Sequence, residues 1–234
     1  IAITLGRKSS INKNVKNIIL IGLGEEEKYS LDALSVTIAD VSKRLRDIKI
    51  ESFSIFLDSF TNKKFSEDAA VEKITISCLI GLYQFIDYKT KDTDKIKQIK
   101  QITIIKNSNK NFDNQMVYAS AVAEAVNKTR DLINTHPNVA TPEFVANYAE
   151  ELAGKSGLKC TVFDEKQIEK MQMGCLIGVG QGSNNKPKLV VLEYRGSSKK
   201  PIAIVGKGVT FDSGGLNLKP YPFIVNMKDD KGGA

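Results

Sequence analysis

Histidine is almost absent from this sequence, because His136 is the single one among 234 residues. A histidine-rich zinc site needs several such ligands, and a Ser-His-Asp hydrolase needs a histidine beside its nucleophile. His136 stands in a short turn-like segment, Asn134 to Asn138, and we expect it to be structural. The scarcity of histidine therefore excludes a histidine-rich zinc site and argues against a triad hydrolase.

Cysteine is also scarce, and the three cysteines stand far apart. The spacing of Cys78, Cys160 and Cys175 fits neither a disulfide framework nor a zinc site. Each lies in an apolar or strand-like stretch of sequence. We therefore expect three buried, reduced thiols, as is usual in a cytoplasmic protein.

Long hydrophobic runs are missing as well. Hydrophobic residues make up 41% of the chain, yet no apolar run approaches the roughly 18 residues that a membrane helix needs. We expect a soluble, cytoplasmic protein without a membrane partner. The sequence also lacks internal repeats and low-complexity tracts.

Positive charge is in excess, with a net charge of +7, and lysines are densest in residues 89–110. One interpretation is a solvated face of a helix and a loop. The alternative is contact with nucleic acid through the N-terminal part of the chain. Because no aromatic residues alternate with these lysines, and no nucleic-acid-binding motif is present, the sequence does not support the alternative beyond its charge.

Strand and helix patterns alternate along the chain, which predicts an α/β fold. Strands are expected at residues 1–5, 15–24, 52–57, 99–105, 160–163, 188–194 and 202–205, and helices at 31–46, 67–85, 114–133, 142–154 and 165–171. Thr141 is the expected cap of the helix that begins with Pro142. We expect the strands at 15–24, 188–194 and 202–205 to be buried.

Two glycine-rich segments do not fit a nucleotide site. Gly22 and Gly24 follow an apolar stretch, but three glutamates come next and would repel a pyrophosphate. Residues 178–182 lack the Gly-Lys-Ser/Thr ending of a phosphate-binding loop. We expect this second segment to be a tight turn between elements.

Charged residues are crowded into a glycine-rich stretch after the strand expected at 202–205. They are Lys207, Asp212, Lys219 and Asp230. Charges near a core are usually paired or metal-bound, and carboxylates are hard oxygen ligands for divalent cations. A lysine can join them as a neutral ligand if desolvation and nearby cations lower its pKa. The alternative is a solvated loop whose charges have no such role.

The order of residues in this stretch resembles the leucine (cytosol) aminopeptidase family. Residues 205–220 (VGKGVTFDSGGLNLKP) are similar to its first metal-binding signature, and residues 227–234 (MKDDKGGA) to its second. Residues 129–143, 173–183 and 187–194 are similar to other parts of its catalytic domain. The resemblance is strong over residues 115–234 and weaker over 15–110.

The resemblance implies a hydrolase, a metal-dependent aminopeptidase that removes N-terminal residues such as leucine from peptides. It implies two divalent metal ions, manganese or zinc, with Lys207 and Asp230 on one metal and Asp212 bridging both. Lys219 would be the catalytic lysine that polarises the substrate carbonyl. The resemblance also implies peptide substrates and a homo-hexamer.

The sequence departs from the family pattern in two ways. No segment matches the family's third signature, which supplies two further carboxylate ligands and an arginine, so we expect this chain alone to lack a complete dinuclear site and to be inactive. Lys231 stands where the family usually has methionine, and its charge beside Asp230 is expected to weaken metal binding. Two alternatives therefore stay open, a non-catalytic relative and a DNA-binding relative, each keeping the fold.

The expected organisation has three parts. Residues 1–112 form a small N-terminal α/β domain whose start is missing, and residues 113–134 form a connecting helix. Residues 135–234 form the start of a mixed-sheet α/β metallopeptidase catalytic domain, truncated before its end.

Overall fold

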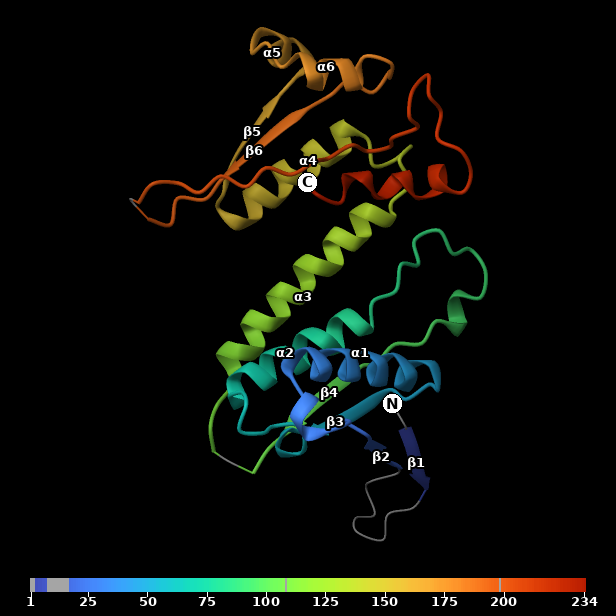
Figure 1. Cartoon of the computed structure of the whole chain (residues 1–234), viewed down its shortest axis with the longest axis vertical. Helices are drawn as coiled ribbons and strands as arrows, with labels where there is room; N and C mark the ends of the chain where they lie inside the picture. The colour runs from blue at the N-terminus through green and yellow to red at the C-terminus, as the bar shows by residue number, and fades with distance from the viewer. Residues whose placement is uncertain (1–2, 8–16, 108, 198) are drawn as a thin grey trace. The chain divides into compact units, whose positions relative to one another are not determined.

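Residues 3–7, 17–107, 109–197 and 199–234 are described by a computed structural model, drawn in Figure 1. Backbone contacts divide the chain into two units, Ile1–Lys128 and Thr129–Ala234. The division falls inside helix α3 (Asp113–Asn134). Each unit mixes helices and strands, so the fold is α/β as the sequence predicts. The finer boundaries at residues 112 and 134 stay a prediction.

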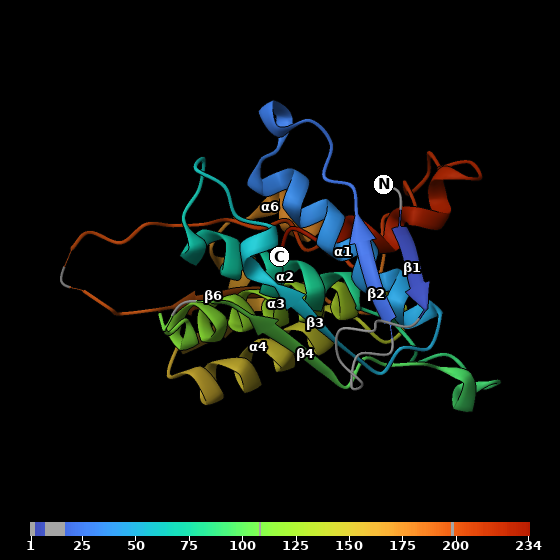
Figure 2. The ribbon, with the colours of Figure 1, turned by 90° about the horizontal axis from the view of Figure 1, so that it is seen from below.

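The first unit contains two of the two-stranded sheets. Strands β1 (Ile3–Arg7) and β2 (Asn17–Ile21) pair antiparallel, and β3 (Ser52–Phe56) and β4 (Gln101–Ile105) pair parallel, as the arrows in Figure 2 show. The other elements are η1 (Glu26–Lys28), α1 (Leu31–Asp47), η2 (Leu57–Ser59), α2 (Glu67–Gly81) and η3 (Thr93–Lys95). Parallel pairing requires a long crossover, which here includes α2.

Serine caps fix the starts of the two packed helices. The side chain of Ser30 accepts a hydrogen bond from the Ala33 amide, and that of Ser66 accepts one from the Ala69 amide, both over 3.2 Å. These oxygens satisfy amides that have no partner within the helix. Near the other end of α2, a Cβ on Gly81 would lie 2.7 Å from the Ala39 carbonyl oxygen. Glycine at this position therefore permits the close approach of α2 to α1.

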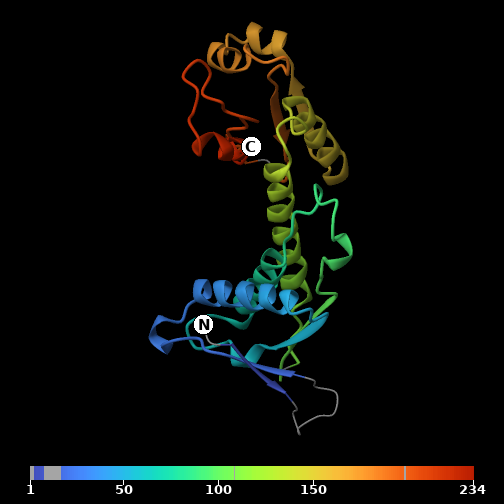
Figure 3. The same ribbon diagram turned by 90° about the vertical axis from the view of Figure 1, so that its right-hand side faces the viewer.

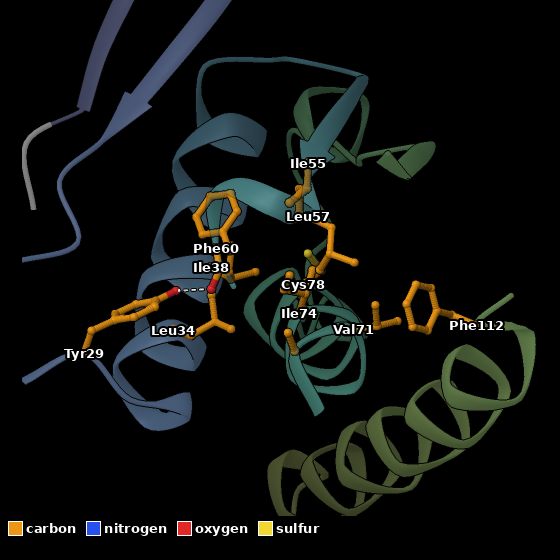
Figure 4. Packing of buried hydrophobic residues seen from close by; sticks show 11 residues of the cluster. Tyr29, Leu34, Ile38, Ile55, Leu57, Phe60, Val71, Ile74, Cys78 and Phe112 are labelled. Atoms are coloured by element: carbon orange, nitrogen blue, oxygen red, sulfur yellow. Dashed lines mark hydrogen bonds between the residues drawn. The ribbon is translucent and has the colours of Figure 1, made fainter. Parts of the chain in front are cut away.

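The hydrophobic core of the first unit lies between α1, α2 and the β3–β4 pair (Figure 4). The Tyr29 hydroxyl donates a hydrogen bond to the Phe60 carbonyl over 2.9 Å, so its polar end is satisfied inside the cluster. The buried members are Tyr29, Leu34, Ile38, Ile55, Leu57, Phe60, Ala70, Val71, Ile74, Cys78 and Phe112.

The second unit contains the antiparallel pair of β5 (Lys159–Phe163) and β6 (Leu189–Glu193). Its helices are α4 (Pro142–Ser156), α5 (Glu165–Lys170), α6 (Gly174–Gly180) and the 3-10 segment η4 (Phe223–Lys231), red in Figure 3. Helix α4 has the predicted Thr141 cap, which accepts from the Phe144 amide over 3.3 Å. It ends at Ser156 and is capped by Gly157, whose φ of +67° suits glycine.

The strand predicted at residues 202–205 is wrong. These residues form no strand in the structure, and Ile202, Ile204 and Val205 are more than 90% exposed. Among the described residues, β5 and β6 pair only with each other. An apolar stretch has high strand propensity only where it can pair and be covered, and no described strand gives residues 202–205 that partner.

Three other expectations of burial or conformation need correction. Strand β2 is half-exposed instead of buried, with Leu20 67% exposed, because it belongs to a two-stranded ribbon. Strand β6 is likewise only partly covered. The turn predicted at residues 178–182 is in part helical, because α6 continues to Gly180.

The cysteines differ in exposure, so the prediction of three buried thiols is wrong. Cys78 is buried in the core, Cys160 is half-buried and Cys175 is exposed, and all three are free. Burial raises the pKa of the Cys78 thiol to about 11. Separately, none of the helices in the described part of the chain has the length and apolar character needed to span a membrane.

Candidate functional site

The second unit brings Lys207 and Asp230 together from two segments of the chain. The Lys207 ammonium donates a hydrogen bond to Asp230 Oδ1 over 2.7 Å. The bond to Asp230 raises the pKa of Lys207, and the charges of Asp230 and Asp212 raise it further. Because Asp212 contributes to this shift, its carboxylate lies within electrostatic range of the Lys207–Asp230 pair.

Asp212 itself forms an ion pair with Lys219. The Lys219 ammonium donates to Asp212 Oδ2 and, over 3.3 Å, to the Asp212 carbonyl oxygen. Asp212 Oδ1 accepts from the Gly214 amide over 2.9 Å. The Lys219 hydrogen bond lowers the pKa of Asp212, and so do the Gly214 amide and the charges of Lys219 and Lys207. The carboxylate is therefore held in its charged form.

Two glycines shape the turn that joins Asp212 to Lys219. Gly214 and Gly215 have φ values of +89° and +66°, which non-glycine residues rarely adopt. A Cβ on Gly214 would lie 2.4 Å from the Asn217 carbonyl oxygen. The Lys219 amide closes the turn on the Ser213 carbonyl over 2.9 Å. The turn thus directs the Lys219 side chain back toward Asp212.

Residues 206–208 lie directly against residues 233–234. A Cβ on Gly206 would lie 2.0 Å from the Gly233 carbonyl oxygen, and one on Gly208 would lie 3.0 Å from the Ala234 Cβ. Only residues without a side chain fit at such a backbone approach. This contact explains how Lys207 reaches a carboxylate that is 23 positions later in the chain.

Asp230 has one carboxylate oxygen without a partner. Its Oδ2 is buried and accepts no hydrogen bond from any described residue. A buried, unpaired carboxylate oxygen is costly, and a bound cation would satisfy it. The Lys207 amine and the Asp230 carboxylate, with Asp212 within electrostatic range, therefore fit part of a divalent metal site. The described residues include no group of three or more histidine, cysteine, aspartate or glutamate side chains placed for a metal.

Lys231, the departure from the family pattern, is buried and only 5% exposed. Its ammonium donates to the Lys228 carbonyl over 2.7 Å and to the Thr135 carbonyl over 3.2 Å. Burial lowers its pKa, and the charge of Lys228 lowers it further. Both of the acceptors named here are main-chain carbonyls, so the ammonium is engaged away from the carboxylate of Asp230.

The end of α3 holds the η4 segment, a role that the residue pattern of the sequence does not indicate. Lys228 donates to Asn134 Oδ1 over 3.0 Å, next to the Lys231 contact with Thr135. His136 follows in a turn, where its Nδ1 accepts from the Asn138 amide over 3.4 Å. The sequence feature that pointed to this region was the resemblance of residues 129–143 to the family. A resemblance does not by itself say which residues are in contact.

All four predicted site residues thus lie in two neighbouring ion pairs. They do not extend from a buried strand, as the sequence suggested, because residues 202–205 are exposed and irregular. They are positioned instead by the glycine contact between residues 206 and 233, the turn at Gly214 and the η4 segment. What each residue does chemically stays a prediction.

Known proteins resemble this chain over nearly its whole length. It is 37% identical over 227 residues to a probable cytosol aminopeptidase of Aquifex aeolicus (strain VF5), covering 96% of this chain and 45% of that protein. It is 34% identical over 227 residues to the corresponding protein of Bacillus subtilis (strain 168), covering 94% and 45%. The chain therefore spans less than half the length of these curated relatives.

Solved structures show the same fold. The bottromycin maturation enzyme BotP in complex with Mn superimposes with a TM-score of 0.81 at 24% identity, covering 99% of this chain and 47% of that one. BotP in a second structure gives a TM-score of 0.78 at 25% identity, with the same coverage.

Two family domains match the chain in order. Residues 4–92 match the N-terminal domain of the cytosol aminopeptidase family, and residues 127–234 match its catalytic domain. Together with the identity to the curated relatives, these matches show that the chain belongs to the cytosol aminopeptidase family.

Proposed function

We propose that this chain is part of a dinuclear-metal-dependent aminopeptidase that hydrolyses N-terminal residues such as leucine from peptides. The observation that carries the proposal is the convergence of Lys207, Asp230, Asp212 and Lys219 within two neighbouring ion pairs. All four occupy positions of the two signature segments that resemble the family's metal-binding signatures. Membership of the cytosol aminopeptidase family supports a peptidase activity.

Lys207 and Asp230 would hold one metal ion, and Asp212 would bridge to a second. Divalent metals, manganese or zinc, would supply a nucleophilic water at neutral pH and polarise the substrate carbonyl. The buried Oδ2 of Asp230 supports this assignment, because it has no other partner among the described residues. The carboxylates of Asp230 and Asp212 already stabilise positive charge, because they pair with the ammonium groups of Lys207 and Lys219.

Lys219 would act on the substrate directly. Its ammonium is oriented by Asp212 through the turn at Gly214, so a positive charge is positioned before substrate binds. Such preorganised charge stabilises a developing oxyanion more than mobile charge does. Lys231 does not oppose the proposal, because its ammonium donates to the carbonyls of Lys228 and Thr135.

The remaining parts of the proposal rest on the family resemblance. They are a homo-hexameric assembly, peptide substrates and a cytoplasmic location. The family's third signature has no counterpart in these 234 residues, so we propose that this chain by itself is inactive.

Hydrolysis of a leucyl chromogenic amide by the complete protein, supplied with Mn²⁺ or Zn²⁺, tests the proposal. We expect Asp212→Asn to lower kcat/KM by at least about 100-fold, the size of effect seen when a preorganised charge is removed from an active site. Asp229→Asn is the matched control, because the Asp229 carboxylate is exposed and its ion pair with Lys228 is long, at 4.0 Å. Activity that survives both chelation and Asp212→Asn would rule the proposal out.

A further inference from the structure

A pocket of about 510 Å³ lies in the first unit, and its lining includes none of the four residues discussed above. It is formed by the end of α1, the residue after its cap and the segment between α2 and β4. We call it the basic pocket. The charged residues that matter for its chemistry are Arg46, Asp47, Lys49, Lys89, Lys91 and Lys97.

Positive charge in the basic pocket is only partly neutralised by the protein. Asp47 is occupied by Arg46, whose Nε and Nη2 donate to Asp47 Oδ1 over 3.0 and 2.8 Å. Asp92 is the other carboxylate in the lining. Within the described residues, none of Lys49, Lys89, Lys91 and Lys97 forms a salt bridge. Four lysines and Arg46 therefore line one hollow together with two carboxylates, those of Asp47 and Asp92.

Hydrogen bonds hold the wall of the basic pocket in place. The Gln84 side chain donates to the Lys97 carbonyl over 3.1 Å and ties the two ends of the segment together. Lys49 has a φ of +66°, and the Ile50 amide bonds to the Leu45 carbonyl over 3.0 Å, which closes the end of α1. Lys49 and Lys97 thus lie in backbone that is held by hydrogen bonds.

A purely structural role explains only part of this charge. Cations favour helix C-termini, which accounts for Arg46 in the last turn of α1. Lys89, Lys91 and Lys97 lie outside any helix, so this effect gives them no stabilising contact. Like charges that share a hollow repel each other unless an anion lies between them.

We propose that the basic pocket binds a small oligophosphate. Lysine ammonium ions bind phosphate as point charges, and the volume falls within the roughly 300–1,000 Å³ of small-molecule sites. Among the described residues of the lining, Ile96 is the one apolar residue and none is aromatic. Without an aromatic surface for stacking, the pocket does not suit nucleobases or single-stranded nucleic acid. The ligand is therefore a phosphate chain, and this inference does not depend on the proposed peptidase activity.

Titration of the purified protein with sodium triphosphate, followed by calorimetry at constant ionic strength, tests this proposal. The variant Lys89→Gln/Lys91→Gln/Lys97→Gln removes three charges from the pocket. The control Lys43→Gln/Lys63→Gln/Lys128→Gln removes three exposed charges from the same unit outside the pocket lining. We expect the pocket variant to weaken triphosphate binding at least tenfold and the control to change it less than twofold.

Three outcomes would overturn the proposal. The first is the absence of triphosphate binding at millimolar concentration by the unmodified protein. The second is equal weakening by both triple variants, which would indicate net charge only. The third is binding of duplex DNA without binding of triphosphate, which would assign the lysines to an extended polyanion. Circular dichroism and thermal midpoints of all three proteins establish that each is folded.

Discussion

The Lys207 ammonium lies 2.7 Å from Asp230 Oδ1, and the second carboxylate oxygen of Asp230 is buried without a partner. One oxygen of the carboxylate is therefore satisfied by an internal cation and the other by none of the described residues. This asymmetry marks a position in the second unit where a bound cation would be stabilised. It leads directly to a prediction on metal binding.

Mn²⁺ is expected to raise the thermal midpoint of the protein, because a ligand that binds only the folded state stabilises it. Asp230→Asn removes a charged oxygen and should reduce this increase to less than half. The neighbouring change Asp229→Asn should leave it intact, since Asp229 is exposed. Midpoints with Mn²⁺ and with EDTA give the measurement, and an undiminished increase in Asp230→Asn would contradict the assignment.

Replacement of Lys231 should depend strongly on the new side chain. Lys231→Ala leaves two partly buried carbonyls without their donor and opens a cavity, so we expect a loss of about 2–4 kcal/mol in the free energy of unfolding. Lys231→Met keeps the volume and removes the cost of burying a charge, so we expect a change within about 1 kcal/mol. Urea unfolding of both variants decides this, and equal losses would show that the ammonium contacts dominate.

Gly206→Ala should separate residues 206–208 from residues 233–234. Its Cβ would lie 2.0 Å from the Gly233 carbonyl oxygen, and overpacking of this kind costs about 1–3 kcal/mol. Gly182→Ala is the matched control, because nothing lies within 4 Å of its added Cβ. Chemical unfolding should show a loss for the first variant only. A neutral Gly206→Ala would mean that the two segments do not pack as described.

The three thiols should react with iodoacetamide at very different rates. Cys175 is exposed and should be modified first, whereas Cys78 is buried and its pKa is raised to about 11. Because the thiolate is the reactive form, we expect Cys78 to react at least 100-fold more slowly than Cys175. Cys160 should be intermediate, since burial and the charge of Glu150 raise its pKa. Mass spectrometry of peptides after timed quenching gives the order.

Cys78 should also make the protein less stable at alkaline pH. Its unfolded thiol ionises near 9, while the folded thiol keeps its proton until about 11. Between these values the folded state binds more protons, so the free energy of unfolding falls as pH rises, by roughly 2–3 kcal/mol. Cys78→Ala should lose this part of the pH dependence, and Cys175→Ala should keep it. Equal slopes in all three proteins would contradict the prediction.

Helices were the most predictable part of the fold. The limits of α1 and α4 agree with the sequence to within a few residues, because Ser30 and Thr141 mark their starts. Capping and helical periodicity are local, so a single sequence carries them. Helix α2 ends four residues earlier than predicted, at Gly81, because apolar residues continue beyond it.

Strand pairing and burial were less predictable, because they depend on distant partners. Residues 202–205 have a strand-like composition, yet in the described structure they have no partner strand. The same reason explains the exposure of Leu20 in β2. The crowding of charges in a glycine-rich stretch indicated Lys207, Asp212, Lys219 and Asp230, and the family resemblance gave their expected roles. The contacts of Lys231 with Thr135 and Lys228, in contrast, required coordinates.

The parallel pairing of Ser52–Phe56 with Gln101–Ile105 has a consequence for biosynthesis. An N-terminal domain generally folds first during translation, but here one strand of the pair lacks its neighbour until residue 105 has left the ribosome. Ile55 and Leu57 would remain uncovered on one side until then. Nascent chains halted before residue 101 should therefore recruit chaperones more strongly than chains halted after residue 112.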